Sequence, residues 1–128
     1  MQVTKFTITL LTAVSGVSAG CYTGGEDGHM GSGLLGQNDI DLACAYLAGD
    51  YSGHEEERYT CVRDSKGIRW DFALKKISDG YRKAGKSECE DGMKKEALSC
   101  QYGGKTSYTN WEYKADPQSG RCNNAGSS

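Results

Sequence analysis

The residues with the clearest potential for acid–base chemistry lie in one short stretch, HEEER, at positions 54–58. It offers His54 and Glu55 as proton-transfer groups and Arg58 as a cation for a phosphate, which are the groups that hydrolysis of RNA needs. No histidine follows position 54, and the other one in the chain, His29, lies in a glycine-rich segment with no visible orienting partner. We therefore interpret HEEER as a solvated turn that precedes a strand.

The spacings that mark other catalytic centres are also missing from the sequence. There is no GxSxG nucleophile elbow and no P-loop. The acidic runs at 55–57 and 88–91 fall where solvent is expected, whereas glycoside hydrolysis needs two acids that face each other across a cleft. No cysteine pair has CxxC spacing and no histidine lies beside one, so zinc is not expected. We predict no catalytic residue, no metal and no cofactor.

Six cysteines are the strongest structural feature of the chain. An even number of cysteines in a small exported protein indicates a disulfide framework, and it also argues against catalysis by a free thiol. Six cysteines allow 15 pairings, among which the sequence does not choose. The predicted disulfide cysteines are Cys21, Cys44, Cys61, Cys89, Cys100 and Cys122.

Aromatic residues are the best candidates for ligand contact. The chain has eight tyrosines and two tryptophans, and such rings give a large contact area at low cost in side-chain entropy. Trp70, Phe72 and Trp111 are each expected in the core, because they lie in alternating segments typical of strands. Polar and aromatic residues near loops are the better ligand candidates. The predicted ligand-binding residues are Tyr22, Gly24, Gly25, Tyr108, Asn110 and Trp111.

The first 19 residues are typical of a secretory signal peptide. Lys5 precedes an apolar run at 6–14, and small residues end the segment at Ala19. We place the cut after Ala19, which leaves one secreted, cysteine-rich domain over residues 20–128 with a frayed tail at 123–128. Loss of Lys5 leaves 14 basic and 17 acidic residues, a net charge of −3. This charge favours neither nucleic acid nor a membrane surface as a partner.

Two helices are predicted to position these side chains. In residues 38–49, apolar residues recur with helical spacing, Asn38 is a candidate N-cap and Gly49 a candidate end. A second helix is predicted over residues 87–100, where Ser87 and Glu90 have the spacing of a capping box. Both helices carry cysteines on their apolar side.

Three strands and two turns are predicted around them. Residues 57–63 and 68–74 are expected to pair as a hairpin through a turn at 64–67. A third strand is expected over 106–115, followed by a tight turn at 116–120 that contains Pro117. This order of elements predicts an α+β fold, in which a small antiparallel sheet packs with two or more helices as a disulfide-stabilised α/β sandwich.

The opening CYTGG at 21–25 and the closing WEYKADPQSGRC at 111–122, together with ECEDGMKKE at 88–96, give the chain a family resemblance. It resembles the Y-three-like lectins, small secreted fungal proteins that bind glycans. The resemblance covers nearly all of residues 20–128. It implies a compact α/β sandwich, an extracellular location, disulfides and a complex glycan or glycoprotein as partner.

The sequence therefore predicts a secreted, extracellular, non-enzymatic glycan-binding protein. Two alternatives stay open. One is a host-directed effector or killer-toxin-like protein that acts on a host protein. The weaker one is a small ribonuclease-like enzyme that uses His54.

Overall fold

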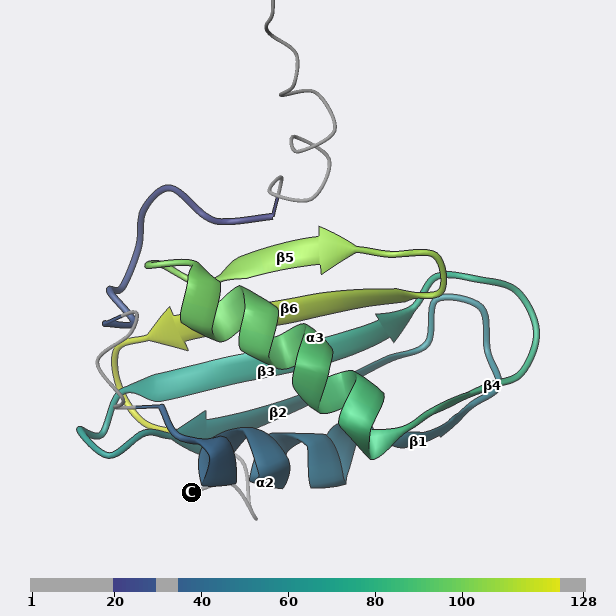
Figure 1. Cartoon of the computed structure of the whole chain (residues 1–128), viewed down its shortest axis with the longest axis horizontal. Coiled ribbons are helices and arrows are strands. Elements are labelled where there is room, and N and C mark those ends of the chain that lie inside the picture. Colours follow the sequence, from purple (N-terminus) through teal and green to yellow (C-terminus); the bar gives the residue numbers. More distant parts are fainter. Residues whose placement is uncertain (1–19, 30–34, 123–128) are drawn as a thin grey trace, which may run out of the picture.

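The computed structural model describes residues 20–29 and 35–122, so the predicted leader (1–19) and tail (123–128) lie outside the described residues. The described chain forms two helices and six strands (Figure 1). In chain order these are α2 (Gln37–Leu47), β1 (Gly49–Tyr51), β2 (Glu57–Arg63), β3 (Arg69–Lys76), β4 (Arg82–Ala84), α3 (Lys86–Ser99), β5 (Gly104–Ser107) and β6 (Trp111–Gln118).

The main sheet has four antiparallel strands in the order β2-β3-β6-β5. A short second sheet pairs β1 with β4. Figure 1 shows α2 and α3 on the same face of the main sheet, with α3 crossing in front of its strands. The predicted α+β fold with an antiparallel sheet covered by helices is thus confirmed.

Alternation along the strands places the core between the sheet and the helices. Trp70, Phe72 and Leu74 of β3 are fully or almost fully buried. Along β6, buried and half-buried residues alternate without a break, as expected for a strand with one face toward the core. Ile40 and Leu47 of α2 complete this core from the helix side.

All six cysteines form disulfides, as predicted. Cys21 pairs with Cys100, Cys44 with Cys89, and Cys61 with Cys122. The Cys44–Cys89 bridge is fully buried and joins α2 to α3. Among the described residues, no group of three or more metal-ligating side chains converges.

Both predicted helix starts are wrong by one or two residues. Helix α2 has Gly36 as its N-cap, and the Asp39 carboxylate accepts a hydrogen bond from the Gly36 amide (2.9 Å). Helix α3 has Gly85 as its N-cap, and Ser87 makes no capping bond. The helix follows β4 directly, since buried Ala84 ends the strand and Gly85 is the only residue between the two elements. Helix α2 ends at Leu47 with Ala48 as its C-cap, and Gly49 follows directly with a positive φ of 130°, the position predicted for a glycine that ends a helix.

The predicted strand at 106–115 is two strands joined by a turn. Strand β5 ends at Ser107 and β6 begins at Trp111, and the Tyr108 amide donates to the Trp111 carbonyl (2.8 Å) to close the turn. The predicted tight turn at 116–120 is also wrong, because Pro117 lies within β6 opposite Trp70. Pairing of β5 with β6 ends at Ala115, so the missing N–H of Pro117 breaks no bond to β5.

Candidate ligand-binding pocket

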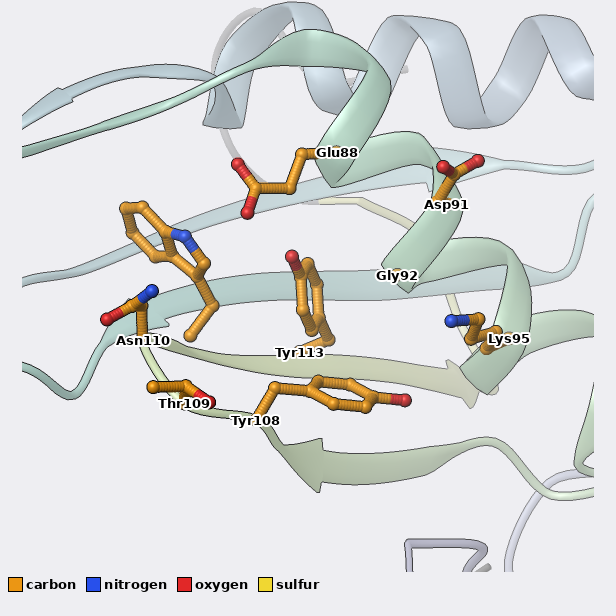
Figure 2. Close-up of a pocket in the computed structure, with 9 residues that line it drawn as sticks. Glu88, Asp91, Gly92, Lys95, Tyr108, Thr109, Asn110 and Tyr113 are labelled. Atoms are coloured by element: carbon orange, nitrogen blue, oxygen red, sulfur yellow. The ribbon is translucent and has the colours of Figure 1, made fainter. Parts of the chain in front are cut away.

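A pocket of about 550 Å³ lies between α3 and the β5–β6 hairpin (Figure 2). This volume falls within the range of roughly 300–1,000 Å³ that is common for small-ligand sites. Helix α3 supplies one wall, the turn after β5 supplies the other, and β6 supplies the floor. The lining residues are Glu88, Asp91, Gly92, Lys95, Tyr108, Thr109, Asn110, Trp111 and Tyr113.

The floor consists of two aromatic rings from the core-facing side of β6. Trp111 is 3% exposed and Tyr113 is 5% exposed. Trp111 also packs edge-on against Tyr51, with ring centroids 5.0 Å apart. The predicted core position of Trp111 is confirmed. Because so little of either ring is accessible, these residues shape the floor and offer a ligand little ring face.

Tyr108 is the accessible ring of the pocket. It is 38% exposed, and its ring meets that of Tyr113 edge-on at a centroid distance of 5.6 Å. The Lys95 ammonium lies 5.6 Å from the centroid of the Tyr108 ring. The Tyr108 ring is therefore in contact with both the floor of the pocket and the α3 wall.

The turn between β5 and β6, which supplies Thr109 and Asn110 to the pocket, is held in place by a hydrogen bond. The Asn110 carbonyl accepts a hydrogen bond from the Ile77 amide (2.9 Å), which ties the turn to the end of β3. Thr109 is exposed and Asn110 is half-buried. The turn therefore presents a hydroxyl and a side-chain amide from an anchored backbone.

The opposite wall is one polar face of α3. Glu88, Asp91 and Lys95 project from it (Figure 2), so the pocket holds two carboxylates and one ammonium. The Glu88 carboxylate points toward the side of the pocket where the Tyr113 hydroxyl lies. Gly92 allows α3 to approach the floor closely, because a Cβ at this position would lie 2.3 Å from the Tyr113 ring.

Burial controls the titration of two tyrosines at this end of the core. It raises the pKa of the Tyr51 hydroxyl to about 12. Burial, followed by the charge of Glu88, also raises the pKa of Tyr113 above its ordinary value near 10. The Tyr51 hydroxyl in addition donates a hydrogen bond to the Leu47 carbonyl (2.6 Å).

These shifts predict two late-titrating tyrosines and a loss of stability in alkali. Because the folded pKa is raised, the stability contributed by the protonated hydroxyls is complete below pH 10. We expect it to be lost as the pH rises from about 10 to about 12. In a titration followed by tyrosinate absorbance, Tyr51→Phe and Tyr113→Phe should each remove one group from the most alkaline part of the curve. Loss of a group that titrates near pH 10 in either variant would contradict this assignment.

The structure brings together half of the predicted ligand residues. Tyr108, Asn110 and Trp111 line the pocket, whereas Tyr22, Gly24 and Gly25 do not. The Tyr22 amide instead donates to the Gly103 carbonyl (2.9 Å). Gly24 and Gly25 are exposed, and a Cβ on either would meet nothing within 4 Å.

The α3 wall was missed by sequence reasoning. Positions 88, 91, 92 and 95 have the i, i+3, i+4 and i+7 spacing of a single helix face. That spacing could have grouped them, but a charged helix face is usually only a solvated one. What turns this face into a pocket wall is the hairpin beside it.

His54 lies away from this pocket, in the exposed turn between β1 and β2. Its Nδ1 is 2.9 Å from Asp79 Oδ1, and its Nε2 is 3.7 Å from Glu55 Oε2. Arg58, the cation of the same stretch, stacks on the Tyr51 ring at 4.0 Å. The Arg58 guanidinium also pairs with the Glu56 carboxylate, with Nη2 and Oε2 3.1 Å apart.

Comparison with known proteins yields no relative: no protein-family model, curated protein or solved structure matches the chain. Within residues 20–29 and 35–122, no helix has the length and apolar character needed to cross a bilayer. The fold and pocket define a three-disulfide α+β domain. It carries a pocket lined by an exposed tyrosine, a side-chain amide, two carboxylates and an ammonium group.

Proposed function

We propose that this chain is a secreted, non-enzymatic glycan-binding protein whose site is the pocket between α3 and the β5–β6 hairpin. The observation that supports this most is the Tyr108 ring, held half-exposed beside side chains that suit sugar hydroxyls. A pyranose presents an apolar C–H face that packs on an aromatic ring. Its hydroxyls can donate to Glu88 or Asp91 and bond with the Asn110 amide.

The charge of the pocket narrows the ligand class. Two carboxylates against one ammonium disfavour sulfated or uronic acid glycans and favour neutral or amino-bearing ones. The three disulfides support an oxidising, extracellular location. A complex glycan or glycoprotein is also the partner that the resemblance to Y-three-like lectins implies.

A glycan array probed with the oxidised domain (20–128) tests the proposal, and titration calorimetry then measures the best ligand. Tyr108→Ala should weaken binding about tenfold, or about 1.4 kcal/mol, because it removes the stacking ring. Tyr46→Ala is the matched control, since Tyr46 is 62% exposed on α2 and lines no part of this pocket. Equal affinities for wild type and Tyr108→Ala would exclude this site.

The alternative function, contact with a host protein, is favoured by one observation. Leu42 and Tyr46 are exposed one turn apart on the outer side of α2, and such apolar pairs are common at protein interfaces. Under this alternative, the expected effects of the Tyr46→Ala and Tyr108→Ala substitutions are exchanged. Tyr46→Ala would then weaken capture of the protein target, while Tyr108→Ala would leave it unchanged and the glycan array would be silent.

A further inference from the structure

The first described residues form a short extended segment at the outer edge of β5 (Figure 1). The Lys105 amide donates to the Gly20 carbonyl (2.8 Å), and the Tyr22 amide donates to the Gly103 carbonyl (2.9 Å). Between them, Cys21 pairs with Gly104 across the ladder and is bonded to Cys100. The position of Gly20 is therefore fixed by hydrogen bonds and by a covalent link one residue away.

Gly20 is buried and packs tightly against Thr106. A Cβ on Gly20 would lie 1.9 Å from Thr106 Oγ1 and 2.5 Å from the Lys105 carbonyl oxygen. A Cβ on Gly104 would lie 2.7 Å from the Gly20 carbonyl oxygen and 2.8 Å from Glu96 Oε1. The Gly20 carbonyl and the Glu96 carboxylate therefore both lie beside Gly104. Positions 20 and 104 are packed so closely that neither has room for a side chain.

Glu96 is a buried acid at this place. It is 3% exposed, and it accepts a hydrogen bond from Thr106 Oγ1 (2.9 Å). Burial raises the pKa of the Glu96 carboxyl, against the opposing effects of this bond and of the charge of Lys95. A cavity of about 260 Å³, with Gly20, Glu96 and Thr106 in its wall, adjoins the carboxylate. A buried acid of this kind is stabilised by a nearby cation.

We propose that cleavage of the chain after Ala19 creates an α-ammonium group on Gly20 that occupies this cavity and pairs with the Glu96 carboxylate. Hydrolysis of the Ala19–Gly20 peptide bond consumes one water, leaving a carboxylate on Ala19 and an ammonium on Gly20. A signal peptidase supplies the catalysis. Removal of the predicted leader thereby adds an ion pair to the fold that the uncut chain lacks.

The pair should make stability depend on pH in a defined direction. An α-amino group ordinarily titrates near pH 8, and a carboxylate partner raises its pKa. The stability that the pair contributes is therefore lost as the pH rises from about 8 through the raised α-amino pKa, and it is also lost at acidic pH, where Glu96 becomes protonated. The other titratable groups that line the cavity are Lys95 of α3 and Tyr108 of the hairpin. Outside the lining, Tyr22 of the edge segment lies near enough to Glu96 for the carboxylate charge to raise the Tyr22 pKa.

The test compares the oxidised domain starting at Gly20 with the same domain carrying one extra alanine before Gly20. Urea unfolding at pH 7 should give the extended chain an unfolding constant about tenfold larger. Glu96→Gln keeps the size of the side chain and an acceptor for Thr106. With this substitution, the domain that starts at Gly20 and the domain with the extra alanine should therefore both fold. The tenfold difference between these two domains should vanish.

Two further measurements test the proposal directly, one on the α-amino pKa and one on the first residue of the exported protein. In the domain starting at Gly20, nuclear magnetic resonance should show an α-amino pKa above 8 that returns to its ordinary value in Glu96→Gln. N-terminal sequencing of the exported product should begin at Gly20. Equal unfolding constants for the two starts, an unshifted α-amino pKa or a different first residue would each overturn the proposal.

Discussion

Replacing Cys44 and Cys89 together by alanine is expected to lower the free energy of unfolding by at least about 4 kcal/mol. The bridge closes a loop of 45 residues, for which the loss of chain entropy in the unfolded state accounts for about 4 kcal/mol. Both sulfurs are also fully buried between α2 and α3, so their removal leaves a cavity. Urea unfolding under oxidising conditions measures the effect.

The Cys61–Cys122 bridge provides the matched comparison. It closes a loop of 61 residues, so chain entropy alone would give Cys61→Ala/Cys122→Ala nearly the same loss. Cys122 is only half-buried, and we therefore expect a smaller total effect than for the helix–helix bridge. A loss below about 1 kcal/mol for the Cys44/Cys89 pair would mean that core packing alone holds the two helices together.

Gly92→Ala is expected to destabilise the protein by about 2 kcal/mol, although the same change usually stabilises a helix by up to about 1 kcal/mol. The reason is steric, because the added methyl group would lie 2.3 Å from the Tyr113 ring. Either α3 moves away from the sheet or the Tyr113 ring moves into the pocket. Thermal and urea unfolding measure the loss, and near-ultraviolet circular dichroism reports the aromatic environment.

Gly53→Ala is the control for this change. A Cβ on Gly53 would lie 3.8 Å from the Glu56 Cβ, an ordinary contact, so its effect should stay within about 0.5 kcal/mol. If Gly92→Ala instead raised the free energy of unfolding, α3 could not pack against β6 as closely as described. The described shape of the pocket would then also be contradicted.

The sequence predicted best the two longer strands that a turn-rich segment separates. Strand β2 was predicted with its observed bounds, and β3, in which the bulky apolar residues Trp70, Phe72 and Leu74 occupy every second position, was predicted within two residues. The β5–β6 turn was missed because Tyr108, Thr109 and Asn110 include no glycine or proline to mark a break. Strands β1 and β4 have three residues each, too few for any period to show.

The site was half predictable for a related reason. Loop-adjacent polar and aromatic residues can be selected from sequence, which identified Tyr108 and Asn110. A pocket wall cannot be selected in this way when its side chains look like any solvated helix face, as Glu88 and Asp91 do. Disulfide pairing had the same difficulty, since it depends on which elements meet in space.

The segment from Gly20 to Tyr22 has a consequence for solubility at high concentration. A bare outer strand is a template on which a second molecule can add its own strand and begin a fibril. Here the segment forms hydrogen bonds with some of the outer backbone groups of β5, and the Cys21–Cys100 disulfide keeps the segment attached to the domain. We therefore expect this disulfide to limit self-association through the β5 edge of the sheet.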